Sequence, residues 1–318
     1  MTRNYNPRKT QVTAPRSSHL SWWLVAVGVG LLVVAGLVWG WPRLPLSSGD
    51  GRLRVVAAEN VWGSIAAQIG GDQVAVTSIV TDPSADPHLY ESDARDAAAL
   101  SSAALVVENG LGYDDFMDKL LAASPSQHRQ VIVASQVVGM ADNGANPHLW
   151  YNLDYAQQVA AAIAAVLAER DPAHRALYEQ RLATFKASLQ PIQAVISELK
   201  SNYAGAPVAY TERVPEYALR AAGLTIKTPV GFAAAIEDGN DPSPVDTQMM
   251  DALMTKHNLK ALLYNAQATS SVTQHVRELA DRSGVAVVAV TETMPAGAAN
   301  YQAWQLQQDE ALLRALEH

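Results

Sequence analysis

Two histidines stand in the same short sequence context, and both could bind a metal ion. Asp86-Pro87-His88-Leu89-Tyr90 and Asn146-Pro147-His148-Leu149-Trp150 share the order acid or amide, proline, histidine, leucine, aromatic. Proline fixes its own φ and favours an extended preceding residue, so each imidazole projects from a stiff turn. One Pro-His pair is typical of an ordinary surface loop. Because the pentapeptide occurs twice, and histidine is the commonest protein ligand of transition metals, we predict that His88 and His148 are metal ligands.

The overall composition limits what else could bind a metal. The chain has 318 residues and no cysteine, so nitrogen and oxygen atoms must supply every ligand. No residue can form a disulfide, act as a thiol nucleophile or carry an N-terminal lipid on cysteine. The length suits two domains better than one core. With 49% hydrophobic and 17% charged residues, the chain resembles a soluble globular protein.

The first fifty residues differ in character from the rest. A basic tail, residues 1–19, precedes an uncharged apolar run over residues 20–41, and residues 42–52 read as a linker. Twenty-two helical residues rise about 33 Å, enough to cross a bilayer. We expect an uncleaved transmembrane anchor, with a cleaved signal segment as the alternative. The basic tail predicts a cytoplasmic N-terminus and an exported body.

Charge divides at the same place. Residues 1–50 contain five basic residues and one acid, so residues 51–318 carry 18 basic and 30 acidic residues, a formal charge of −12. Such an acidic body is a poor partner for nucleic acid or anionic lipid. It suits a cationic ligand, although solubility alone would also explain the charge.

Short β-rich runs alternate with helical patterns along the exported body, which predicts α/β lobes with mostly parallel sheets. We place an N-terminal α/β lobe at residues 53–171 and a C-terminal α/β lobe at residues 205–318. Residues 172–204 carry a helical apolar stripe and are expected to form a single long connecting helix, bent near Pro191. A helical connector predicts only modest closure of the lobes on binding.

Several segments together resemble the metal-binding solute-binding family of ABC transporters, which includes zinc and manganese receptors. The resemblance rests on DPHLYE, NPHLWYN, VVAAENVWGSIAAQIGGDQVAV and the long middle helix, and it covers nearly all of residues 53–318. It implies two α/β lobes joined by one long helix, with the metal in the cleft between them. It also implies that His88 and His148 bind the metal from the N-terminal lobe.

The resemblance implies two further ligands on the C-terminal lobe. The third stands five residues before an aromatic residue that leads into a helix ending in Gly-Leu, and Glu212 occupies this position ahead of Tyr217. Glu216 is a rival. The fourth is usually an aspartate after the last strand, and this chain departs from that pattern with Glu292 at the matching position. Both acids would lie at carboxyl ends of strands, where α/β sheets place ligands.

The expected function is that of an extracytoplasmic substrate-binding subunit, a monomer that captures Mn²⁺ or Zn²⁺ and delivers it to an ABC permease and its ATPase. Fe²⁺ is a further option. A metal-dependent hydrolase and a surface adhesin on the same scaffold are the alternatives. The sequence contains no His-Glu-x-x-His run, no Gly-x-Ser-x-Gly elbow and no phosphate-binding glycine loop, so we predict that the protein is not an enzyme.

Overall fold

The computed structural model describes residues 51–82, 90–141, 143–256 and 259–317. The chain divides into the units Met1–Pro45 and Leu46–His318, and all described residues belong to the second. The predicted membrane segment, residues 20–41, therefore lies outside the described residues. None of the helices in the described ranges is both long and apolar enough to span a bilayer.

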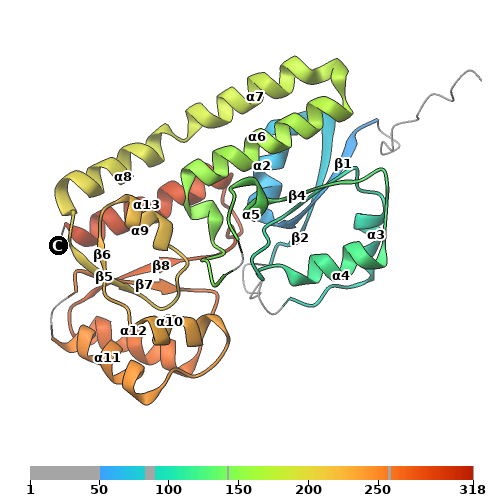
Figure 1. Ribbon diagram of the computed structural model, residues 1–318. Helices are drawn as coiled ribbons and strands as arrows, with labels where there is room; N and C mark the ends of the chain where they lie inside the picture. The colour runs from blue at the N-terminus through green and yellow to red at the C-terminus, as the bar shows by residue number, and fades with distance from the viewer. Residues whose placement is uncertain (1–50, 83–89, 142, 257–258, 318) are drawn as a thin grey trace, which may run out of the picture. The chain divides into compact units, whose positions relative to one another are not determined.

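The first lobe is built around a parallel four-stranded sheet (Figure 1). In chain order its elements are β1 (Leu53–Glu59), α2 (Asn60–Gly70), η1 (Gly71–Gln73), β2 (Val74–Val80), α3 (Ala94–Ser101), β3 (Leu105–Glu108), α4 (Asp115–Ala123), β4 (Gln130–Val133), α5 (Ala134–Val137), η3 (Leu149–Tyr151) and α6 (Leu153–Arg170). The strand order is β2-β1-β3-β4. Helices pack on both faces of this sheet, so its central strands are apolar on both sides, as parallel strands require.

The second lobe repeats this plan. Its elements are β5 (Pro207–Tyr210), α9 (Glu216–Ala221), β6 (Thr225–Ile226), α10 (Val230–Glu237), α11 (Pro244–Thr255), β7 (Ala261–Asn265), α12 (Ser271–Arg282), β8 (Ala286–Val290) and α13 (Tyr301–Leu316). The strand order β6-β5-β7-β8 is again parallel throughout and has the same pattern as the first sheet. The prediction of two α/β lobes with parallel sheets is therefore confirmed.

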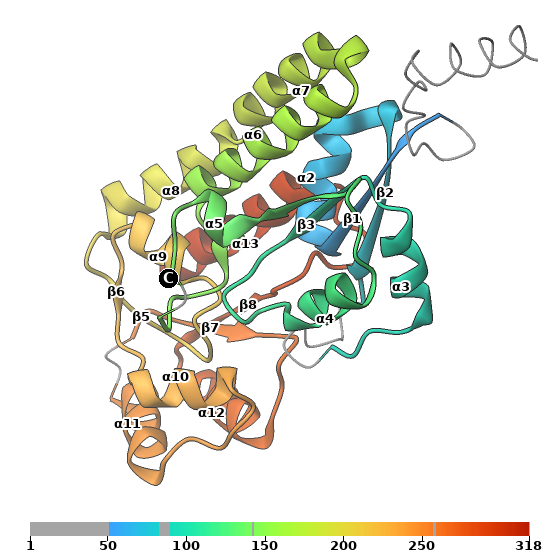
Figure 2. The same ribbon diagram turned by 45° about the vertical axis from the view of Figure 1, so that its right-hand side comes forward.

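The connecting segment bends near Pro191 as expected, but at the bend it divides into two successive helices instead of continuing as one. These are α7 (Arg175–Ser188) and α8 (Gln190–Tyr203), preceded by η4 (Pro172–His174). The break falls at Leu189 because Pro191 has no N–H, and in a continuous helix its ring would clash with the carbonyl of Ala187. In the first turn of α8 the missing N–H costs nothing. In both views α7 lies along α6 and α8 along α13 (Figures 1 and 2).

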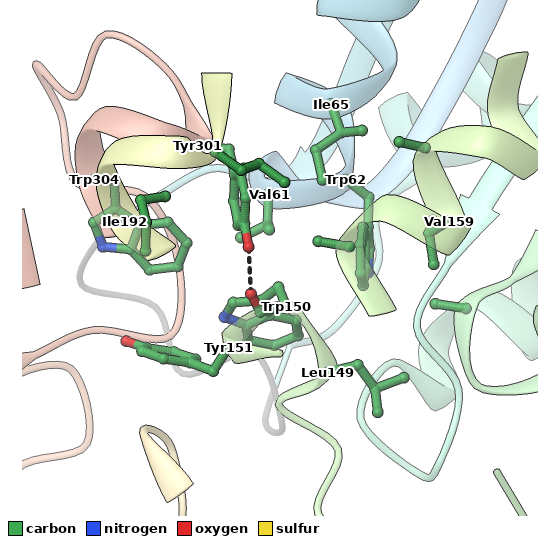
Figure 3. Packing of buried hydrophobic residues seen from close by; sticks show 14 of the residues in the cluster. Val61, Trp62, Ile65, Leu149, Trp150, Tyr151, Val159, Ile192, Tyr301 and Trp304 are labelled. Atoms are coloured by element: carbon green, nitrogen blue, oxygen red, sulfur yellow. Dashed lines mark hydrogen bonds between the residues drawn. The ribbon is translucent and has the colours of Figure 1, made fainter. Parts of the chain in front are cut away.

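One buried apolar cluster extends through both lobes. Trp62 of α2 packs edge-on against Trp150, with ring centroids 6.1 Å apart, and Tyr301 of α13 donates its hydroxyl hydrogen to the Trp150 carbonyl at 2.6 Å (Figure 3). Two further clusters lie on the other faces of the sheets, under α3 and α4 in the first lobe and under α10, α11 and α12 in the second. Because the shared cluster is continuous, the lobes are joined by packing as well as by α7 and α8.

Candidate metal centre

Three polar side chains meet at the carboxyl edge of the second sheet. Glu212 follows β5, Asn265 ends β7, and Glu292 follows β8. Because β7 lies between β5 and β8, Asn265 lies between the two carboxylates. Its Nδ2 donates to Glu212 Oε2 and to Glu292 Oε1, each at 2.7 Å. The exposed fractions are 2%, 1% and 0% for Glu212, Asn265 and Glu292, so this carboxylate pair is withdrawn from solvent.

His148 approaches the pair from the first lobe. The Asn146 Oδ1 accepts from the backbone N–H of His148 at 3.0 Å and lies 2.8 Å from its ring Nδ1. Since a backbone N–H only donates, this Asn146 atom is the oxygen, and the ring hydrogen belongs on Nδ1. Nε2 lies 3.4 Å from Glu292 Oε2. The ring is thus oriented with Nε2 towards the carboxylate, an arrangement suited to a cation bound by both.

Hydrogen bonds across the lobes hold this geometry. The Tyr113 hydroxyl of the first lobe donates to Glu292 Oε2 at 3.0 Å. Asn146 donates its Nδ2 hydrogen to the Arg213 carbonyl at 2.7 Å, and Tyr217 donates to the Asn146 carbonyl at 2.8 Å. The loop that carries the histidine is thus tied to the loop that carries Glu212.

An ion pair lies behind the histidine. Arg213 Nε donates to Glu237 Oε2 at 2.6 Å, and Glu237 Oε1 lies 3.8 Å from His148 Nδ1. Burial opposes the charge on Arg213, but the bond and the charge of Glu237 outweigh it and raise the pKa of Arg213. A cavity of about 980 Å³, lined in part by Asn146, Arg213 and Glu237, opens beside this ion pair. The side of the imidazole away from Glu292 therefore faces a negative group.

A second set of buried carboxyls lies in the first lobe. Glu59 ends β1, Glu108 ends β3, and Asp114 precedes α4. Burial raises the pKa of Glu108 to about 8 and that of Asp114 to about 6. Burial, and then the charge of Asp114, raise the pKa of Glu59 well above its ordinary value. Asp114 accepts backbone N–H groups from Asn109 and Gly110 at 2.6 and 2.8 Å, and these bonds oppose the effect of burial on its pKa.

The structure places the predicted ligands as follows. His148 and Glu292 are in direct contact, and Glu212 is joined to Glu292 through Asn265. His88 lies outside the described residues, in the gap at 83–89. Within the described ranges no three His, Asp or Glu side chains are grouped as ligands of a single ion.

Glu216 and His174 have other partners. Glu216, the rival of Glu212, accepts from the Tyr210 hydroxyl at 3.1 Å and from Arg220 Nε at 2.7 Å. The ring Nδ1 of His174, the last residue of η4, lies 2.7 Å from Asp171 Oδ2. These contacts account for both residues as parts of local hydrogen-bonded groups.

Sequence reasoning missed two residues that touch the carboxylates, Asn265 and Tyr113. Asn265 had a usable signal, because it is a polar residue at the carboxyl end of a buried strand, the same position that drew attention to Glu212 and Glu292. Tyr113 had none, since it lies in a loop of the other lobe and reaches Glu292 across 179 residues of sequence.

Comparison with known proteins gives a family match. The profile of the family described as ZnuA, the periplasmic component A of a zinc-uptake complex, matches residues 55–315, more than half of the chain. The chain is 31% identical over 172 residues to ScbA, a metal ABC transporter substrate-binding lipoprotein of Streptococcus cristatus. It is 25% identical over 250 residues to the manganese-binding lipoprotein MntA of Bacillus subtilis. The ScbA match covers 50% of this chain and 54% of ScbA, and the MntA match covers 74% and 78%. The chain thus spans about half the length of the first curated relatives it matches.

Solved structures share the fold. The substrate-binding protein FpvC of Pseudomonas aeruginosa, in complex with Mn²⁺, has a TM-score of 0.69 at 23% identity over 84% of this chain and 98% of its own. The periplasmic zinc-binding protein TroA of Treponema pallidum has a TM-score of 0.72 at 19% identity over 84% and 99%. At these identities the likeness establishes the architecture of the lobes.

Proposed function

Because the chain belongs to the family of periplasmic zinc-uptake component A proteins, we propose that it is the extracytoplasmic substrate-binding subunit of an ABC importer for a divalent transition metal. It captures the ion between its lobes and delivers it to a membrane permease driven by an ATPase. It acts as a binding protein and not as an enzyme, because its task ends with capture and release of an unaltered ion.

The observation that carries this proposal is the contact between His148 and Glu292. His148 Nε2 and Glu292 Oε2 lie 3.4 Å apart, both side chains are fully buried, and they come from opposite lobes. A ring nitrogen and a carboxylate oxygen brought together from opposite lobes in a buried place can bind the same cation. We assign the ligand set to His88 and His148 from the first lobe and Glu212 and Glu292 from the second.

The proposed cargo is Mn²⁺ or Zn²⁺. Two carboxylates with two imidazoles form a harder site than three imidazoles with one carboxylate, and this favours Mn²⁺. Zn²⁺ binds a given nitrogen and oxygen site more tightly than Mn²⁺, so affinity alone does not identify the physiological ion. The relatives are described with both ions, since MntA is a manganese-binding lipoprotein and TroA a zinc-binding protein.

The proposal includes the place of the protein in the cell. Residues 20–41 anchor the body to the outer face of the membrane, or are removed on export, and the body works as a monomer. The support is the uncharged run behind a basic tail, together with the formal charge of −12 on residues 51–318, which suits capture of cations.

Calorimetric titration of the chelator-stripped protein with Mn²⁺ and with Zn²⁺ tests the proposal. We expect one ion per chain, and His148→Ala should weaken binding tenfold or more, because changes one shell further out already cost 10–100-fold. The matched control is His275→Ala, which removes an exposed histidine paired with Asp251. Wild-type affinity in His148→Ala would refute the site, and the absence of binding to wild-type protein would refute the function.

A further inference from the structure

Asn265 lies between the carboxylates of Glu212 and Glu292. Neither the family match nor the sequence gives this asparagine a role. Its side-chain amide has two N–H hydrogens, and each is donated to a different carboxylate at 2.7 Å. Because both oxygens lie 2.7 Å from the same nitrogen, they are at most twice that distance, about 5.4 Å, apart. Two buried carboxylates this close repel each other, and the amide dipole between them offsets the repulsion.

The orientation of this amide is fixed by its other contacts. The backbone N–H of Gln267 donates to Asn265 Oδ1 at 3.0 Å, and a backbone N–H can only donate, so the nitrogen faces the carboxylates. The Asn265 backbone N–H donates to Thr211 Oγ1 at 3.0 Å, which fixes the strand end beside the Glu212 loop. The side chain is 1% exposed, so it has little freedom to turn away.

Gln267 extends the same support to the second carboxylate. Its Oε1 accepts the backbone N–H groups of Glu292 and Thr293, at 2.5 and 2.9 Å, and its Nε2 donates to Thr293 Oγ1 at 2.6 Å. Gln267 therefore holds both the Asn265 side-chain amide and the backbone of Glu292 in place.

The first lobe uses an asparagine in a similar way. Asn109 directly follows β3, the strand whose place in the order β2-β1-β3-β4 matches that of β7 in the second sheet. Its Nδ2 donates to the Pro147 carbonyl at 2.9 Å, next to His148. In each lobe a buried asparagine therefore lies at the end of the third strand of the sheet, β3 or β7. Asn109 bonds to the loop that carries His148, and Asn265 bonds to the side chains of Glu212 and Glu292.

We infer that Asn265 is a positioning residue that leaves each carboxylate with one oxygen for the cation and so sets selectivity between ions of different coordination number. This inference rests on the proposed function. The amide engages Glu212 Oε2 and Glu292 Oε1, so each carboxylate would bind the cation through its other oxygen, which keeps the site near four-coordinate. For Glu292 this is Oε2, which also accepts the Tyr113 hydroxyl hydrogen at 3.0 Å and lies 3.4 Å from His148 Nε2. Zn²⁺ accepts four ligands readily, whereas an ion that prefers more oxygen ligands gains from carboxylates that bind through both oxygens.

The test compares Asn265→Ala, which removes both donors, with Asn265→Ser, which retains at most one. Zn²⁺ and Mn²⁺ are titrated in competition, and X-ray absorption measures the coordination number of each bound ion. We expect Asn265→Ala to shift the ratio of dissociation constants at least tenfold towards Mn²⁺ and to raise the coordination number, with Asn265→Ser in between. The matched control is Gln302→Ala, which removes another buried amide that donates to Gln68 and Ser188.

The outcomes separate this inference from the proposed function. If wild-type protein binds neither ion, the proposed function fails. If wild-type protein binds but Asn265→Ala weakens both ions equally with an unchanged coordination number, Asn265 supports the fold only and the inference is overturned. Should Asn265→Ala fail to fold, Asn265→Ser decides, because an unchanged ratio in that variant also overturns the inference.

Discussion

Neutral amide side chains orient three of the residues proposed as metal ligands, His148, Glu212 and Glu292. Asn146 orients the imidazole of His148 through Nδ1, and Asn265 separates the carboxylates of Glu212 and Glu292. An amide can donate and accept at once, so it fixes a tautomer or a carboxylate rotamer without adding charge to a buried place. The orientations of His148, Glu212 and Glu292 are therefore set by neutral amide side chains.

A substitution at Glu212 tests its assignment as a ligand. We expect Glu212→His to raise the preference for Zn²⁺ over Mn²⁺ in competition titrations, because an imidazole is a softer donor than a carboxylate. Glu216→His is the matched control, since Glu216 is a nearby acid engaged with Tyr210 and Arg220. An unchanged ratio in Glu212→His would mean that this side chain does not touch the metal.

The sequence predicts part of this site, and the residues that it does not predict were missed for physical reasons. His148 followed from the repeated Pro-His turn, and Glu212 and Glu292 followed from the family resemblance. Asn265 was within reach of the argument from strand ends, but asparagine at a strand end is common in turns as well. Tyr113 was out of reach, because its contact with Glu292 depends on how the two lobes pack.

Helix α13 buries an acid, Asp309, away from the proposed metal site. Asp309 is 5% exposed, and burial raises its pKa to about 7, against about 3.9 in an unfolded chain. Between these values the unfolded chain gives up a proton that the folded protein keeps. The free energy of unfolding therefore falls as pH rises from about 4 to about 7, because the buried Asp309 becomes ionised. Above that range the full destabilisation by the buried charge is present.

Removing this charge should stabilise the protein in a pH-dependent way. We expect Asp309→Asn to raise the free energy of unfolding at pH 8 by at least about 1 kcal/mol, since one pKa unit corresponds to about 1.4 kcal/mol. The gain should shrink steadily towards pH 5. Urea unfolding at several pH values measures it, with Asp281→Asn on the exposed face of α12 as the control. A gain that does not change with pH would show that packing, not ionisation, causes the difference.

The helices also show what periodicity can and cannot predict. The spacing of apolar residues predicts a helix over Leu153–Ala168, and α6 spans Leu153–Arg170. It also predicts a single connecting helix, because the apolar stripe continues through residues 172–204. The helix is broken at Leu189, but apolar residues on both sides of the break are buried in the same cluster. The apolar periodicity therefore continues through the break and does not reveal it.

Over the whole described molecule, the lobes are bound to each other along their length. The continuous apolar cluster, α7 and α8, and paired bonds such as those between the Asn60 side chain and the Met294 backbone all cross from one lobe to the other. Opening the lobes widely would expose part of this cluster to water, at roughly 25 cal/mol for each Å² of apolar surface. We therefore expect only small relative movement of the lobes when the cargo binds.

A crystal structure of the metal-loaded protein, with anomalous data collected at the absorption edge of the added ion, tests the central claim most directly. We predict one anomalous peak between the lobes, about 2.0–2.2 Å from His148 Nε2, a nitrogen of His88 and oxygens of Glu212 and Glu292. The lobes should superpose on those of the present structure with little rotation. A peak at another place, or density between His148 and Glu292 without anomalous signal, would refute the proposed metal site.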